Sequence, residues 1–159
     1  MPLRKVISGG QTGADQGGLL GARLAGIATG GLAPKGWRTE VGNAHALLRD
    51  FGLREAPYPE YAYRTRENVR NSDGTLIIGS SASPGSRLTR RCCEELRRPF
   101  FVFEWPECGR SQSLEDVVRW ALVHELRTLN VAGNRESKAP GIHDFTSRLV
   151  LQLCGAINL

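Results

Sequence analysis

The stretch that decides the fold is "ISGGQTGADQGG", residues 7–18, in which five of the twelve positions are glycine. It follows the apolar residues Val6 and Ile7 and leads into the leucine- and alanine-rich residues 19–26. Glycine is used where the backbone turns sharply or where another group approaches it closely. The stretch therefore predicts a first strand, a tight loop and a first helix, and it raises the question of what approaches the loop.

The remaining chain alternates short apolar segments with amphipathic ones. Strands are expected within residues 4–10, 27–34, 53–57, 75–79, 100–105 and 128–133, and helices within 14–26, 41–52, 58–74, 86–99, 113–126 and 141–157. Because the strands are continuously apolar, both faces of the sheet should be covered and the sheet should be mainly parallel. The sequence predicts a Rossmann-like three-layer α/β/α sandwich, formed as a single domain over residues 1–159.

The apolar spacing within two helices also predicts which side chains reach the core. In the first helix these are Leu19, Leu20, Leu24 and Ala25, and in the helix within 113–126 they are Leu114, Val117, Val118, Ala121 and Leu122.

Charge distribution excludes some classes of protein. The chain has 21 Lys and Arg against 16 Asp and Glu, a net charge of +5, and the excess is spread over both halves rather than gathered in blocks. This distribution does not indicate a nucleic-acid-binding arm. No apolar run approaches the roughly 20 residues that span a membrane. We therefore expect neither nucleic acid nor membrane as a partner.

Cysteine usage points to a reducing compartment. The four cysteines, Cys92, Cys93, Cys108 and Cys154, show no C-x-x-C motif and no spacing typical of disulfides, and the chain opens without a signal pattern. Thiols are kept reduced in the cytosol. The sequence therefore predicts a cytoplasmic protein with buried or incidental cysteines.

The first loop resembles an anion site. Gly9, Gly10 and Gly13 lie where a strand turns into a helix, and a helix N-terminus offers free N–H groups and partial positive charge. The spacing G-G-x-x-G differs from the dinucleotide fingerprint G-x-G-x-x-G, and the Gly-Lys-Ser/Thr of a P-loop is missing. From these residues alone, the loop is either a ligand loop or a structural turn.

Two further polar loops follow strands that are expected to lie near the first. They are "SSASPGSRLT", residues 80–89, and the polar part of "LNVAGNRESKAPG", residues 129–141, at the end of the last strand. The carboxyl ends of parallel strands share one edge of the sheet, where ligands bind. Either loop could also be a solvated turn, but together with the first loop they favour a phosphate-bearing ligand.

The helix expected within residues 58–74 carries very little apolar surface. It is either very exposed or turns functional groups inward, and it supplies Tyr61, Arg64, Thr65, Asn68 and Asp73.

Motifs for hydrolysis and metal binding are missing from the sequence. His45, His124 and His143 are scattered without a Glu at metal-binding spacing, and no nucleophile elbow G-x-S-x-G occurs. The sequence therefore predicts no metal site and no set of catalytic residues.

The motifs "KVISGGQTGADQGGL", "APKG", "YAYRTRENVRNSDGTLII" and "LNVAGNRESKAPGI" together resemble the molybdenum carrier family, relatives of the algal molybdenum cofactor carrier protein. That family lies in a Rossmann-like superfamily with the lysine-decarboxylase-like cytokinin-activating phosphoribohydrolases. The resemblance implies a homo-oligomer, dimer or tetramer, that binds molybdenum cofactor (molybdopterin) or a similar phosphorylated pterin or nucleotide-like small molecule.

In this resemblance residues 9–13 form a first ligand loop, residues 83–89 a second, and residues 130–137 close the site. The predicted cofactor-binding residues are Gly9, Gly10, Gln11, Thr12, Gly13, Asp15, Lys35, Arg64, Asn68, Ser83, Gly85, Ser86, Arg87, Thr89, Asn130, Gly133, Arg135 and Ser137.

The chain departs from the family pattern in both of the first two loops. Where relatives tend to carry Arg after the Asp of the first loop, this chain has Gln16. Where relatives often read Gly-Gly-Thr in the second loop, residues 85–87 read Gly-Ser-Arg. Both changes fall at the expected phosphate site, so the identity of the ligand could differ.

A non-catalytic carrier is the favoured function. In the phosphoribohydrolase motif P-G-G-x-G-T-x-x-E, Cys92 occupies the place of the catalytic glutamate, and a carboxylate is what stabilises the cationic sugar of glycosidic cleavage. One alternative is still an enzyme acting on a nucleoside monophosphate, with Asp15, Asp73 or Glu94 as the acid. The other is a nucleotide-sensing module.

Overall fold

The computed structural model describes residues 2–106 and 112–159. Within these residues six parallel strands form one sheet in the order β5-β2-β1-β8-β6-β7. The strands are β1 (Lys5–Ile7), β2 (Ala28–Ala33), β5 (Leu53–Glu55), β6 (Gly74–Ile78), β7 (Phe100–Phe103) and β8 (Thr128–Gly133). The predicted Rossmann-like α/β fold is confirmed. β8 comes last in the sequence but lies between β1 and β6.

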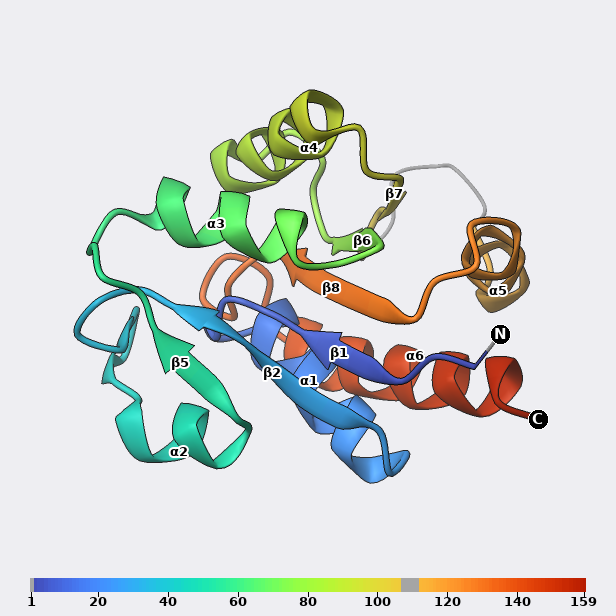
Figure 1. Ribbon diagram of the computed structural model, residues 1–159, viewed down its shortest axis with the longest axis horizontal. Helices are drawn as coiled ribbons and strands as arrows, with labels where there is room; N and C mark the ends of the chain where they lie inside the picture. Colours follow the sequence, from blue (N-terminus) through green and yellow to red (C-terminus); the bar gives the residue numbers. More distant parts are fainter. Residues whose placement is uncertain (1, 107–111) are drawn as a thin grey trace.

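Helices cover both faces of the sheet (Figure 1). On one face lie α1 (Ala14–Leu24), α5 (Leu114–Val123) and α6 (Ile142–Ile157), and on the other lie α3 (Tyr61–Arg70) and α4 (Pro84–Leu96). The short α2 (His45–Asp50) packs beside β5 through Leu48. A small antiparallel hairpin of β3 (Arg38–Thr39) and β4 (Gly42–Asn43), absent from the sequence prediction, precedes α2.

Helix α1 reaches the core through small residues rather than leucines alone. A Cβ atom at Gly17 would lie 2.5 Å from the carbonyl oxygen of His143 in α6, and Gly21 meets α6 one turn further along in the same way. Because α6 packs directly on this glycine face, the predicted inward position of Leu24 is wrong, and its side chain is 62% exposed. The same prediction is wrong for Leu122 of α5, which is 48% exposed.

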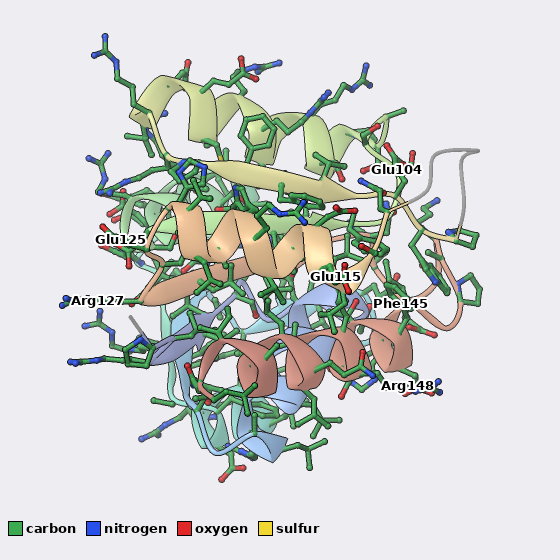
Figure 2. All side chains as sticks on the ribbon, turned by 90° about the vertical axis from the view of Figure 1, so that its right-hand side faces the viewer. Glu104, Glu115, Glu125, Arg127, Phe145 and Arg148 are labelled. Atoms are coloured by element: carbon green, nitrogen blue, oxygen red, sulfur yellow. The ribbon has the colours of Figure 1, made fainter. Side chains whose placement is uncertain are left out.

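All strands of the sheet end at the same side of the molecule. Figure 2 shows Glu125 and Arg127, which precede β8, at one end, and Glu104, which follows β7, at the opposite end. Phe145, from the first turn of α6, lies at this second end. The loops singled out from the sequence therefore gather around the carboxyl ends of the strands.

The cysteines that the structure describes are buried thiols. Burial raises the pKa of Cys93 and of Cys154 to about 11, and it also raises the pKa of Cys92. A raised pKa keeps a thiol protonated and unreactive. Cys108 lies outside the described residues.

Candidate functional site

A cavity of about 1090 Å³ opens at the carboxyl ends of β1, β8, β6 and β7. Helix α3 borders it on one side through Tyr61, Arg64 and Thr65. Small-molecule sites are typically concave and roughly 300–1,000 Å³ in volume, so this cavity is large enough for one. Eight predicted site residues line it: Gln11, Asp15, Arg64, Ser83, Gly85, Thr89, Gly133 and Arg135.

The other predicted site residues do not line this cavity. They are Gly9, Gly10, Thr12, Gly13, Lys35, Asn68, Ser86, Arg87, Asn130 and Ser137. Several of them have structural contacts instead. The Asn68 side chain bonds both the N–H and the carbonyl of Leu32, and Asn130, inside β8, donates to Thr75 of β6 at 3.2 Å. Lys35 and Arg87 are exposed.

The glycines of the first loop are required by other parts of the protein. A Cβ atom at Gly9 would overlap the Arg64 guanidinium, which packs on this position. At Gly13, where φ is +79°, a Cβ atom would lie 2.7 Å from the backbone nitrogen of Glu136. Only glycine combines this backbone conformation with so close an approach. What approaches these two glycines is therefore the protein itself.

The amides of the first loop are also engaged within the protein. Four of them donate to protein acceptors, namely those of Gly10, Gln11, Thr12 and Ala14. The Gln11 amide donates to Asp15 Oδ2 at 3.1 Å. Because these N–H groups already donate to acceptors within the protein, they are not available to bind an external phosphate.

Two further carboxylates brace the neighbouring loops. Glu40, from the turn between β3 and β4, accepts the Ser137 amide at 3.1 Å and the hydroxyl groups of Thr12 and Ser137. Glu136 accepts the amides of residues 141 and 143 at the start of α6. Sequence reasoning did not single out Glu40, because nothing near it in the chain marks its distant partners.

The ionisation of Glu40 follows from these contacts. Desolvation opposes its charged form, but the hydrogen bonds from Ser137 and Thr12, together with the charge of Arg135, lower the pKa of this carboxyl below its usual range. Glu40 is therefore a carboxylate at neutral pH and can accept all of these bonds.

Asp15 is the buried carboxyl of the cavity wall. It is 3% exposed, and its Oδ2 atom lies 3.5 Å from Arg64 Nη1. Burial raises the pKa of Asp15 to about 6, against the opposing effects of Arg64, the Gln11 amide and Arg135. A carboxyl whose pKa is shifted this far, in a cavity and beside a cation, is a feature of functional sites.

Cations outnumber carboxylates around the cavity. Among the described residues, Arg64, Arg135 and Lys138 line it, against the single carboxyl of Asp15. Within residues 2–106 and 112–159, the side chains of Arg135 and Lys138 form no hydrogen bond or ion pair, and the buried Nε of Arg64 has no hydrogen-bond partner. The excess of positive charge around the cavity favours an anionic ligand.

Apolar and aromatic side chains form the rest of the wall. Trp105, after β7, stacks on Phe145 with ring centroids 5.4 Å apart, and Tyr61 lies under the Arg64 guanidinium at 5.3 Å. Leu88 of α4 completes this surface. Trp105, Tyr61 and Leu88 were not among the predicted site residues. The sequence marked the segments that carry Trp105 and Tyr61, but not which face of each would meet the cavity.

The acids considered for the enzyme alternative are far from equivalent. Asp15 lines the cavity, whereas Asp73 accepts the amides of residues 127 and 128 at the opposite end of the sheet. Glu94 is exposed on α4. Cys92, at the place of the glutamate in the phosphoribohydrolase motif, is buried between α3 and α4 and does not line the cavity.

Comparison with known proteins shows the family to which the chain belongs. The sequence profile of the circularly permutated YpsA SLOG family (cpYpsA) matches residues 6–154. The chain belongs to this family. A solved protein of similar structure is named "Putative molybdenum carrier protein" and comes from Syntrophus aciditrophicus SB. It is 34% identical, aligns with 96% of this chain and 94% of its own, and has a TM-score of 0.81. No curated protein matches the chain.

Two features are absent from the part of the chain that the structure describes. No helix there is both long enough and apolar enough to cross a membrane. Likewise, no group of three or more His, Cys, Asp and Glu side chains there could hold a metal ion.

Proposed function

We propose that the protein binds and carries a phosphorylated pterin, such as molybdenum cofactor, in the cavity at the carboxyl ends of β1, β8, β6 and β7. The observation that carries this proposal is that one cavity combines an aromatic wall with two cations, Arg135 and Lys138, whose side chains form no hydrogen bond or ion pair with the described residues. The cations suit a phosphate, and the aromatic and apolar wall suits a flat ring. The name of the solved relative from Syntrophus aciditrophicus supports the same ligand.

The phosphate is held by the second and third loops rather than by the first. Helix α4 begins at the cavity, with Ser83 as N-cap and Gly85 in its first turn. A Cβ atom at Gly85 would meet nothing within 4 Å, so the backbone is open to a ligand there. The positive end of this helix and the two free cations act on the same anion.

The test is direct loading of the protein with cofactor. Apo protein is incubated with molybdenum cofactor released from a molybdoenzyme and is then re-isolated. We expect a fluorescent pterin after oxidation and a stoichiometric amount of molybdenum by mass spectrometry. The double variant R135A/K138A should lose both signals, whereas R87A, which removes an exposed arginine outside the cavity, should keep them. Absence of both signals from the wild-type protein would rule out the proposal.

A second candidate function is cleavage of a nucleotide N-glycosidic bond, and Asp15 is the observation that favours it. With a pKa of about 6, this carboxyl is partly protonated near neutral pH and could protonate a leaving base. A panel of nucleoside monophosphates should then release free base, and D15N should abolish the release. If the wild-type protein leaves the whole panel intact, this second candidate is excluded.

Assembly into a homo-oligomer and a cytoplasmic location stay predictions. Light scattering on the purified protein gives the mass of the assembly, and cell fractionation gives the location.

A further inference from the structure

Asp15 and Gln11 each have one side-chain hydrogen-bonding atom that has no partner among the residues that the structure describes. Asp15 Oδ2 accepts the Gln11 amide and faces Arg64. Its other oxygen, Oδ1, accepts no hydrogen bond from any residue that the structure describes. Only 3% of the surface of Asp15 is exposed, and this residue lines the cavity. Asp15 is therefore a nearly buried hydrogen-bond acceptor of the cavity wall, and one of its two oxygens is free.

The orientation of the Gln11 side-chain amide is fixed. Its Oε1 atom accepts two backbone N–H groups, from Thr12 at 3.0 Å and from Glu40 at 2.8 Å. Because both partners are donors, the oxygen must face them and the NH2 group must face away. The Nε2 atom donates to none of the described residues. Gln11 is 7% exposed and also lines the cavity.

One acceptor and one donor therefore belong to two residues that line the same cavity, and these residues are joined by the hydrogen bond from the Gln11 backbone amide to Asp15. A ring edge that complements them carries an N–H group next to a carbonyl oxygen. The 2-amino-4-oxopyrimidine ring of pterins and guanine has this edge, with a further amino group beside the N–H. A carboxylate can accept from both of these donors.

We infer that the cavity selects a ligand with a 2-amino-4-oxopyrimidine ring, through Asp15 accepting its ring N–H and amino groups and Gln11 donating to its carbonyl. This inference rests on the proposed function, which supplies the phosphate at Arg135 and Lys138. The charged side chains of the cavity favour the same orientation, with the ring at Asp15 and the phosphate at Arg135 and Lys138. Asp15 repels a phosphate, whereas Arg135 and Lys138 attract one. Adenine presents a lone pair toward Asp15 and an amino group toward the Gln11 NH2, so it is disfavoured at both positions.

The first test uses the wild-type protein and two matched ligand sets. Calorimetry measures the Kd values of GMP, IMP and AMP, which share one ribose phosphate. Fluorescence titration compares 6-hydroxymethylpterin with 6-hydroxymethyllumazine, in which a carbonyl replaces the amino group. We expect GMP and IMP to bind about tenfold or more tightly than AMP, and the pterin to exceed the lumazine by a similar factor, because unpaired polar groups in a buried site are costly.

The outcomes separate this inference from the proposed function. If AMP binds as tightly as GMP and the lumazine as tightly as the pterin, the cavity binds phosphorylated or ring ligands without this selectivity and the inference is overturned. If none of the five compounds binds, the inference is overturned, and the cofactor-loading experiment decides the proposed function separately.

The second test changes the protein. In D15N the amide oxygen takes the place of Oδ2, where the Gln11 amide donates, so the new NH2 group faces the ligand in place of Oδ1. The preference should then shift toward AMP, with GMP weakened about tenfold or more. D50N is the matched control, because Asp50 is an exposed carboxylate paired with Arg23 outside the cavity. A D15N protein that folds and keeps the wild-type ligand preference would contradict the inference. If D15N does not fold, the comparison of ligands on the wild-type protein still tests the inference.

Discussion

Replacing Asp15 with asparagine should make the protein more stable at alkaline pH. Burial raises the pKa of this carboxyl from 3.8 to about 6, a shift of about two units that corresponds to about 3 kcal/mol. The folded protein therefore binds this proton more tightly than the unfolded chain does. The stabilisation is fully present below about pH 4, is lost as pH rises through about 6, and does not return at higher pH.

The D15N variant avoids the cost of ionising a buried carboxyl. At pH 8 it should exceed the wild-type free energy of unfolding by up to about 3 kcal/mol, and the difference should shrink toward pH 4. The lost attraction to Arg64 is already included, because Arg64 lowers the pKa within the net shift. Urea unfolding at pH 8, 6 and 4.5 measures the difference.

D50N serves as the control for the same chemical change, because the Asp50 side chain is 70% exposed. It should change the free energy of unfolding little at any of the three pH values. The reasoning is refuted if D15N is no more stable than the wild type at pH 8, or if its advantage is as large at pH 4.5 as at pH 8.

Three further substitutions, G13A, E40Q and R135A, test the bracing of the loops and the cation at the cavity, with G155A and R87A as controls. G13A forces a side chain onto a φ of +79° against the facing loop, so urea unfolding should show a loss of about 2–4 kcal/mol. G155A, in open space within α6, should gain up to about 1 kcal/mol. E40Q should lower Tm at pH 7. Because the pKa of Glu40 is lowered, this carboxylate stabilises the protein fully above its ordinary pKa and progressively less below it, so the difference in Tm between the wild type and E40Q should shrink in melts as pH falls below about 4.5. R135A should leave the free energy of unfolding within about 0.5 kcal/mol of wild type while weakening a phosphate-bearing ligand about tenfold. R87A should change neither quantity, and equal weakening by both arginine variants would argue against a specific phosphate site.

Most of the fold could be predicted from local patterns. Continuous apolar runs such as residues 75–79 gave the buried strands, and helical spacing gave the helices between them. The prediction for Leu24 was wrong, because the core-facing side of α1 is decided by how closely α6 approaches Gly17 and Gly21. Helical periodicity cannot reveal that approach, since glycine contributes no apolar side chain to the pattern.

The candidate site could be predicted only in part. The sequence placed Asp15, Arg64 and Arg135 among the binding residues, and the fold brings them to one cavity. It also placed Asn130 there, although this side chain lies inside the sheet and bonds β6. Residue type and loop position indicate which end of the sheet a residue approaches, but not whether its side chain already has a partner.

By itself, "ISGGQTGADQGG" determined a strand, a loop and a helix at the ligand-binding edge of a parallel sheet, because turning and helix formation depend on neighbouring residues. Only the tertiary structure decided what the glycines of that loop are for. Gly9 makes room for Arg64, and Gly13 makes room for the loop after β8. The loop is also held by Glu40, whose partners Thr12 and Ser137 are 28 and 97 residues away in the chain. Contacts between such distant residues exist only once the chain has folded, so the sequence marked the loop while the fold decided how its donors are used.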